Sequence, residues 1–135
     1  LEGVMRFIEI VPDTTIELGD GLSIRTIRMT HSVETFGFAL RKSDMPLFSY
    51  MPDTLWNDDL LPHIQNGGKV VLIDLNGERQ DSHRVHLSED ELAEKALPLC
   101  ARDIIFYGTH LKRQKPTGSG RIRYVRPGDR IAIPE

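Results

Sequence analysis

The sequence predicts an α/β domain in which a mixed sheet is combined with two main helices. Two observations lead to this prediction. The first fifty residues contain short β-rich segments separated by turn signals, whereas the rest of the chain alternates apolar runs with segments of helical periodicity. The chain has 135 residues, which is enough to bury one hydrophobic core. We therefore expect a single domain that spans residues 1–135.

The N-terminal part of the chain is expected to form an antiparallel sheet. Its segments are rich in β-branched and aromatic residues, and Gly19-Asp20-Gly21 is a tight-turn signal because glycine adopts positive φ without steric cost. Short strands that follow each other at this spacing usually pair with their sequence neighbours. The expected strands are Phe7–Val11, Thr14–Leu18, Ser23–Met29, Thr35–Arg41 and Leu47–Met51.

The second part of the chain is expected to alternate helices and buried strands. Thr54 is a plausible N-cap of a first helix that ends at Asn66-Gly67-Gly68, and Ser88 to Glu91 has the pattern of a capping box for a second helix. Continuous apolar runs of this length indicate strands that are buried on both faces. The expected strands here are Lys69–Leu75, Asp103–Thr109, and a closing hairpin of Arg121–Val125 and Arg130–Ile133.

Composition limits the classes of function. The net charge is −3, so binding to nucleic acid would require a local basic patch rather than a bulk basic excess. The single cysteine, Cys100, cannot form an internal disulfide, and this suits a reducing cytoplasm. No run approaches the roughly 18 apolar residues of a membrane span. We therefore expect a cytoplasmic protein with no membrane partner.

Polar residues recur where the predicted strands end. His31, Asp53, Asp74 and His110 each lie at or just after the end of an apolar strand. In α/β layers such positions gather at one edge of the sheet. Imidazole and carboxylate together suit zinc, manganese or iron. Each residue taken alone also has a plainer interpretation, since Asp53 could simply begin a helix.

Four short motifs appear in a recognisable order. They are His31 at the start of H-S-V-E-T-F-G-F, Asp53 in M-P-D-T, His86 in H-L-S, and His110 in Y-G-T-H. From about Ile16 to the C-terminus, this order resembles the C-terminal half of metallo-β-lactamase-fold hydrolases. The likeness is greatest to the branch of ribonuclease Z and the class II cyclic-nucleotide phosphodiesterases.

The resemblance implies a role for each matched residue. His31, Asp53 and His110 would be ligands of a divalent metal, with zinc favoured over manganese or iron, and Asp53 would bridge two metals. His86 would assist proton transfer, so that His86 and Asp53 are the expected catalytic residues. The basic loop that contains Lys112 and Arg113 would bind an anionic substrate.

The family's main metal motif, His-x-His-x-Asp-His, is absent from the sequence. We therefore expect an N-terminal half-domain or a second subunit to complete the site. A half-fold would also expose an apolar sheet face, for which Phe36, Phe38, Leu47, Phe48 and Tyr50 are candidates. The implied function is metal-dependent hydrolysis of a phosphodiester, either a cyclic nucleotide or an RNA 3′ end, by a homo-oligomer. The alternative is an inactive scaffold or dimerisation module of the same fold.

Overall fold

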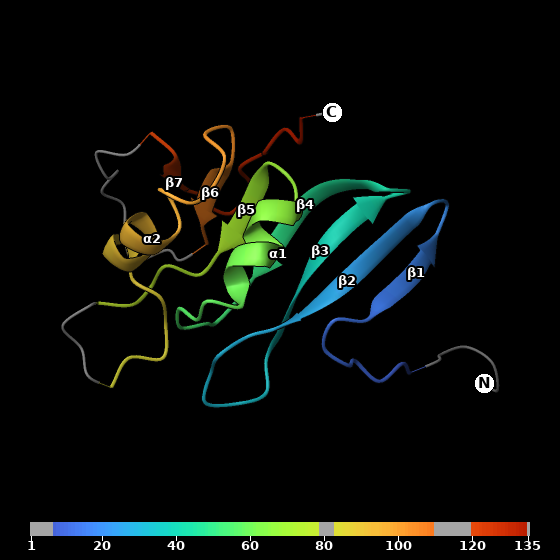
Figure 1. The fold of residues 1–135 in the computed structure, drawn as a ribbon, viewed down its shortest axis with the longest axis horizontal. Coiled ribbons are helices and arrows are strands. Elements are labelled where there is room, and N and C mark those ends of the chain that lie inside the picture. The colour runs from blue at the N-terminus through green and yellow to red at the C-terminus, as the bar shows by residue number, and fades with distance from the viewer. Residues whose placement is uncertain (1–6, 79–82, 110–119, 135) are drawn as a thin grey trace.

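The computed structural model describes residues 7–78, 83–109 and 120–134, which form one seven-stranded sheet with two short helices (Figure 1). The strands lie in the sheet in chain order. They are β1 (Thr15–Gly19), β2 (Leu22–Arg28), β3 (Phe36–Lys42), β4 (Met45–Met51), β5 (Val70–Ile73), β6 (Ile105–Gly108) and β7 (Ile122–Tyr124). The helices are α1 (Leu60–Asn66) and α2 (Glu89–Lys95).

The sheet consists of an antiparallel part and a parallel part. β1 to β4 pair antiparallel, as short turn-linked strands do. β4 to β7 pair parallel, with α1 in the connection from β4 to β5 and α2 in the connection from β5 to β6. This arrangement confirms the expected α/β class with a mixed sheet and two helices. Because β2, β4, β5 and β6 run in the same direction, their carboxyl ends share one edge.

One face of the sheet forms the hydrophobic core together with the two helices. Strand residues of this face, among them Val71 and Phe106, are fully buried and belong to the same cluster as Ile64 of α1 and Leu92 of α2. Each such side chain contributes about 1.5–3 kcal/mol when it leaves water. The core therefore fixes both helices on the same side of the sheet.

The opposite face carries two rows of large side chains that run across the strands. The register aligns Ile24, Leu40, Phe48, Val70 and Ile105 in one row, and Thr26, Phe38, Tyr50, Leu72 and Tyr107 in the other. Apart from the buried Thr26 and Val70, these side chains are only half-buried. The Phe38 ring meets Phe48 and Tyr50 edge-on, at centroid distances of 6.1 and 5.7 Å. We call these two rows the outer sheet face.

The N-terminal strand predicted over Phe7–Val11 is wrong. This segment has no strand pairing, and the Phe7 side chain is 90% exposed. The chain turns at Asp13, which has a φ of 57°, and the hydroxyl of Thr26 holds the carbonyl of Val11 at 2.5 Å. This side-chain contact anchors Val11 to β2, but a strand ladder needs paired backbone groups.

Two further boundaries differ from the sequence prediction. α1 begins at Leu60 instead of Thr54, because the Thr54 hydroxyl accepts the Thr30 N–H at 3.1 Å and donates to the Leu55 carbonyl. The closing hairpin is also absent from the described part of the chain. β7 pairs in parallel with β6 instead, and residues 130–133 follow a turn in which the Asp129 N–H donates to the Arg126 carbonyl.

The N-terminus of α2 agrees with the prediction. The Ser88 hydroxyl accepts the Glu91 N–H at 3.3 Å, as the capping pattern requires. Glu91 itself completes an ion pair with Arg84 at 2.9 Å. The cap matters for the site because it fixes the segment directly before the helix, which contains His86.

Candidate metal centre and proton donor

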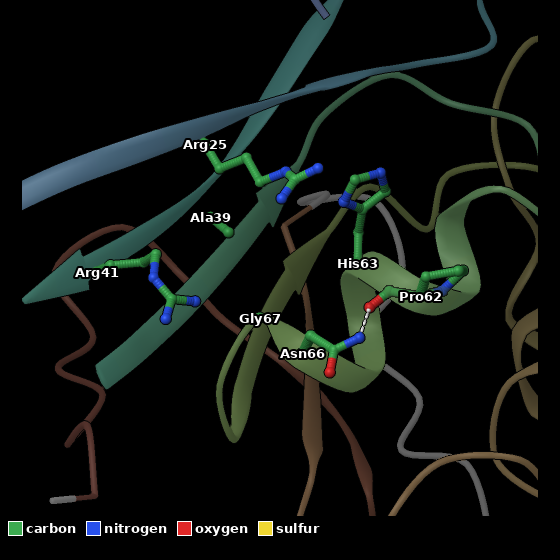
Figure 2. A pocket seen from close by; sticks show the side chains of 7 residues that line it. All are labelled: Arg25, Ala39, Arg41, Pro62, His63, Asn66 and Gly67. Carbon is green, nitrogen blue, oxygen red and sulfur yellow. Dashed lines mark hydrogen bonds between the residues drawn. The ribbon is translucent and has the colours of Figure 1, made fainter. Parts of the chain in front are cut away.

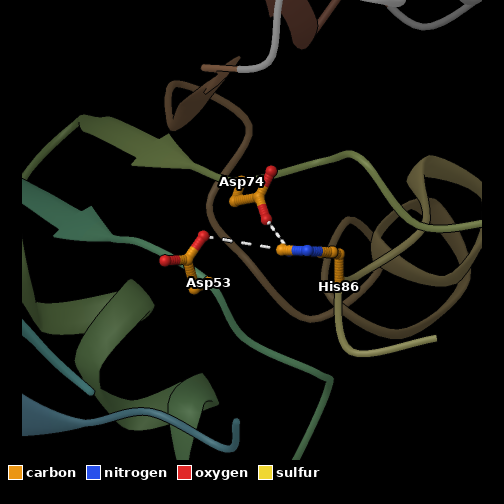
Figure 3. A group of neighbouring side chains, drawn as sticks. All are labelled: Asp53, Asp74 and His86. Carbon is orange, nitrogen blue, oxygen red and sulfur yellow. Dashed lines mark hydrogen bonds and ion pairs between the residues drawn. The ribbon is translucent and has the colours of Figure 1, made fainter. Parts of the chain in front are cut away.

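Side chains from four separate segments meet at the carboxyl edge of the sheet. His31 follows β2, Asp53 follows β4, Asp74 follows β5, and His86 precedes α2. This is the edge at which open α/β sheets place their ligands, because the strands end there and the loops diverge. Three of these residues, Asp53, Asp74 and His86, offer ligand atoms that all lie within 4.8 Å of one another (Figure 3).

The loop with His31 is tied to the segment that follows Asp53. The Thr30 carbonyl accepts the Leu55 N–H at 2.9 Å, and the Thr30 N–H donates to the Thr54 hydroxyl. The Asn57 amide donates to the Thr30 hydroxyl at 2.6 Å. These contacts connect residues 24 or more positions apart, and they explain why Thr54 is buried rather than available as a helix cap.

Asp53 and Asp74 follow adjacent parallel strands, β4 and β5, but lie in different environments. The Asp74 N–H donates to the Met51 carbonyl at 3.1 Å, which continues the sheet pairing past the strand ends. Asp53 has a φ of 30°, an uncommon value for a residue other than glycine. The Asp53 side chain is 55% exposed and that of Asp74 is 6% exposed. The Asp53 carboxylate is therefore accessible to solvent at the site, whereas the Asp74 carboxylate is buried beneath the site.

His86 reaches the site through a close contact between two backbone segments. The Gly77 N–H donates to the Leu87 carbonyl at 2.9 Å, and Gly77 forms a parallel bridge with Ser88. A Cβ atom on Gly77 would lie 2.0 Å from the His86 carbonyl oxygen. Only glycine permits this approach.

The imidazole of His86 is held by a buried carboxylate. Its Nδ1 is hydrogen-bonded to Oδ2 of Asp74, and Oδ1 of Asp53 lies 3.8 Å from the same nitrogen (Figure 3). A carboxylate can only accept, so Nδ1 carries the proton and Nε2 is the nitrogen left for chemistry. This hydrogen bond fixes the tautomer and the ring orientation, as a carboxylate does behind a catalytic or metal-binding histidine.

Both ring nitrogens of His31 are buried, and neither has a hydrogen-bond partner among the described residues. Its ring centroid lies 5.6 Å from that of His86. Leaving buried imidazole nitrogens unpaired is costly, whereas a bound metal ion would satisfy one of them. A donor set of imidazole and carboxylate fits a divalent metal, and the described residues whose ligand atoms come together are Asp53, Asp74 and His86.

The remaining predicted site residues lie outside the described part of the chain. They are His110, the third expected metal ligand, and Lys112 and Arg113, the expected contacts to the substrate. The last described residue before them is Thr109, whose N–H donates to the Ile73 carbonyl at 3.0 Å. The roles assigned to these three residues remain predictions.

Two residues have roles that the sequence did not indicate. Asp74 was noticed as a strand-end carboxylate, but no sequence spacing connects it with His86, twelve positions away. Arg121 was expected as the first residue of the strand Arg121–Val125. In the structure its guanidinium donates to the carbonyls of Leu97, Ala101 and Ile104. It therefore connects the segment after α2 with the residue directly before β6.

Comparison with known proteins identifies the fold. The metallo-β-lactamase fold protein YhfI from Bacillus subtilis superposes with a TM-score of 0.69 at 16% identity, over 90% of this chain and 54% of that protein. A diphosphatase from the PhnP family superposes with a TM-score of 0.62 at 20% identity, over 91% of this chain and 48% of that protein. No protein-family model and no curated protein matches the sequence.

The chain therefore has the metallo-β-lactamase fold, as the order of its motifs predicted. It spans about half the length of the two solved proteins. At these identities the likeness defines the fold alone, and the assignment to the ribonuclease Z branch stays a prediction. Among the described residues, no helix is long and apolar enough to cross a membrane.

Proposed function

We propose that this chain carries the proton-donating part and some of the metal ligands of a metal-dependent phosphodiester hydrolase. The observation that supports this most directly is the pair of Asp74 and His86, placed beside Asp53 and His31 at the carboxyl edge of the sheet. A fixed imidazole next to a group of metal-type donors can combine proton transfer with metal-assisted hydrolysis of a phosphate ester. The diphosphatase of the same fold supports the choice of phosphoryl chemistry.

In this proposal, each candidate residue of the chain has a separate role in hydrolysis. His31, Asp53 and His110 would hold a divalent metal, zinc or otherwise manganese or iron, which would supply an activated water and neutralise charge on the phosphoryl oxygens. Nε2 of His86 delivers a proton to the leaving oxygen, and Asp74 keeps that nitrogen in position. Lys112 and Arg113 contact the phosphate of the substrate.

The proposal also includes a partner for this chain. The sequence has no His-x-His-x-Asp-His motif, and the two solved proteins of this fold are about twice as long. We propose that an N-terminal half-domain or a second subunit brings the remaining ligands and packs a second sheet on the outer sheet face. Two sheets that pack face to face lie about 10 Å apart and interdigitate their apolar side chains. Such an assembly in the cytoplasm is consistent with a single cysteine.

The test measures metal and activity together. The chain is purified alone and with the N-terminal half co-expressed, metal content is determined by mass spectrometry, and hydrolysis of bis(p-nitrophenyl) phosphate is followed. His31→Ala, Asp53→Ala and His110→Ala should each lower the metal content of the completed protein and abolish hydrolysis. His83→Ala, an exposed histidine, serves as the matched control.

The outcomes separate the two candidate functions. If all three variants retain the metal content of the wild type, the site assignment is wrong. If neither the chain alone nor the completed protein binds metal or hydrolyses the ester, the inactive scaffold is the better description.

A further inference from the structure

The segments that carry His31 and Asp53 leave the sheet from strands that are not neighbours. β2 and β4 both end at the carboxyl edge, but β3 lies between them in the sheet. Because adjacent strands are about 4.8 Å apart, the ends of β2 and β4 are separated by about 10 Å. A connection across the start of β3 is therefore needed to hold His31 and Asp53 in one site.

β3 permits this connection because it has no side chain where the two segments cross it. A Cβ atom on Gly37 would lie 3.2 Å from the terminal methyl carbon of Met29 and 3.2 Å from Cδ of Pro52. Met29 lies two residues before His31, and Pro52 directly precedes Asp53. The two segments therefore approach each other at Gly37.

The hydrogen bonds between the two segments all involve Thr30. Its N–H donates to the hydroxyl of Thr54 at 3.1 Å, and its carbonyl accepts the N–H of Leu55 at 2.9 Å. Its hydroxyl accepts a hydrogen bond from the side-chain amide of Asn57 at 2.6 Å. The backbone and side chain of Thr30 are thus both paired with the segment that follows Asp53. We call Thr30, Thr54, Leu55 and Asn57 the threonine clamp.

Thr54 is the member of the threonine clamp that directly follows Asp53. It is fully buried, and its hydroxyl both accepts the Thr30 N–H and donates to the Leu55 carbonyl at 2.8 Å. Asp53 has a φ of 30°, and such a conformation persists in a residue other than glycine only where the surrounding structure enforces it. Thr54 supplies this constraint, since its side chain cannot rotate without losing both hydrogen bonds.

The helix α1 does not brace the loop that contains His31. A cavity of about 240 Å³, around which Figure 2 shows Arg25, Arg41 and His63, separates this helix from β2 and β3. A second cavity, of about 1020 Å³, extends along the residues after β2 as far as His31. Open space therefore lies between α1 and this loop, and the threonine clamp holds the loop to the segment of Asp53.

The position of the His31 ring depends on the backbone of its loop. The ring centroid lies 5.6 Å from that of His86, and the two buried ring nitrogens have no hydrogen-bond partner among the described residues. Hydrogen bonds of its own therefore do not orient the ring within the part of the chain that the structure describes. A shift of Thr30 would move the ring with it.

We infer that Thr54 is a positioning residue, which fixes His31 relative to Asp53 and thereby raises the affinity of the site for a divalent metal ion. This inference rests on the proposed function, in which His31 and Asp53 would both be ligands. Thr54 acts through the backbone of its two neighbours in the clamp. Removal of residues that orient metal ligands typically lowers metal affinity by roughly 10–100-fold.

The experiment measures the zinc affinity of the completed protein by competition with a chromogenic chelator. Thr54→Val keeps the shape of the side chain but removes the hydroxyl, so the zinc affinity should fall roughly tenfold. Thr54→Ser keeps the hydroxyl and should retain most of the affinity. Thr26→Val is the matched control, because Thr26 is also a buried threonine whose hydroxyl accepts a backbone N–H, that of Thr14 at 3.0 Å. This control should lower the melting temperature and leave the zinc affinity unchanged.

A second measurement requires no metal. Diethyl pyrocarbonate modifies accessible imidazole nitrogens, and mass spectrometry of peptides gives the rate for each histidine. In the metal-free protein His31 should react slowly because both of its ring nitrogens are buried, and the exposed His83 gives the reference rate. Thr54→Val should raise the rate at His31 several-fold, whereas Thr26→Val should not.

Several outcomes would overturn the inference. If Thr54→Val has the zinc affinity and the His31 reactivity of the wild type, Thr54 does not position the ligands. An equal loss of affinity in Thr26→Val would show general destabilisation instead. Asn57→Ala, which removes only the amide bonded to Thr30, should show the same changes to a smaller extent, and it decides the question if Thr54→Val does not fold.

Failure of the proposed function is recognised separately. If the wild type binds no zinc, that function is wrong and the effect on affinity fails with it. The comparison of His31 reactivity in wild type and Thr54→Val then still shows whether Thr54 fixes this ring.

Discussion

The two ring nitrogens of His86 have different roles. Nδ1 makes a structural hydrogen bond, and Nε2 is available for chemistry. Its Nδ1 is hydrogen-bonded to Asp74, a side chain that is only 6% exposed, while the ring packs near His31. The motif around His86 indicated its function from the sequence. The identity of its partner required the structure, because residues 74 and 86 approach only when β5 and the segment before α2 pack together.

Asp74→Asn should lower kcat for phosphodiester hydrolysis by about 10–100-fold and leave KM nearly unchanged. The amide no longer provides a charged acceptor for the Nδ1 proton, so His86 is held less firmly in its tautomer. Steady-state kinetics of the metal-loaded, completed protein would measure this. Asp74→Glu should recover part of the loss, and Asp20→Asn, an exposed turn residue, should have no effect. A change confined to KM would contradict the positioning role.

At the scale of elements, the site depends on where strands stop and how the following loops are tied. β4 and β5 end next to each other, so Asp53 and Asp74 become neighbours although twenty-one residues separate them. Strand-end positions could be predicted from the apolar runs. The start of α1 could not be predicted in this way. Thr54 is a residue type that often caps helices, but its hydroxyl accepts a hydrogen bond from the Thr30 N–H instead.

Gly77→Ala tests the backbone contact between Gly77 and the segment 86–88, which positions His86 at the site. The new methyl group would lie 2.0 Å from the His86 carbonyl oxygen, so one of the two backbone segments must shift. We expect the free energy of unfolding to fall by about 1–3 kcal/mol and kcat to fall with it. Urea denaturation would measure the first and steady-state kinetics the second.

Gly120→Ala is the control for this prediction, because a Cβ at that position has nothing within 4 Å. Gly77 and Gly120 lose the same backbone freedom on substitution, so the difference between the two variants reports the contact with His86. Equal stability of Gly77→Ala and wild type would mean that the segment adapts without cost.

At the scale of the whole molecule, the sheet has two unequal faces. One is covered by α1 and α2 and holds the buried core, while the outer sheet face presents two rows of half-buried side chains. Exposed apolar surface of this kind marks an interaction site. Five residues were expected on the exposed face, and the register places Phe38, Phe48 and Tyr50 there, with Phe36 two positions before Phe38 on the same strand. The expectation for Leu47 is wrong, because Leu47 directly precedes Phe48 in β4 and alternates to the other face.

The isolated chain should therefore bind the dye ANS, and addition of the N-terminal half should reduce the fluorescence. Phe48→Thr should weaken dye binding by the isolated chain and also weaken association with the other half, because it removes an aromatic side chain from the middle of the outer sheet face. Val33→Thr, which changes a 65% exposed loop residue, is the control. Absence of dye binding by the wild-type chain would show that this face is already covered.

The sequence by itself determined the α/β class, most strand positions, the cap of α2, and three of the residues that meet at the candidate site: His31, Asp53 and His86. These depend on local patterns, such as alternation, apolar runs and short motifs, that exist before the chain folds. Only the tertiary structure decided that Asp74 supports His86, that Arg121 binds carbonyls, and that Thr54 joins the segment of Asp53 to that of His31. The physical reason is that hydrogen bonding and charge act over a few ångströms in space, and distance along the chain does not reveal which side chains come that close.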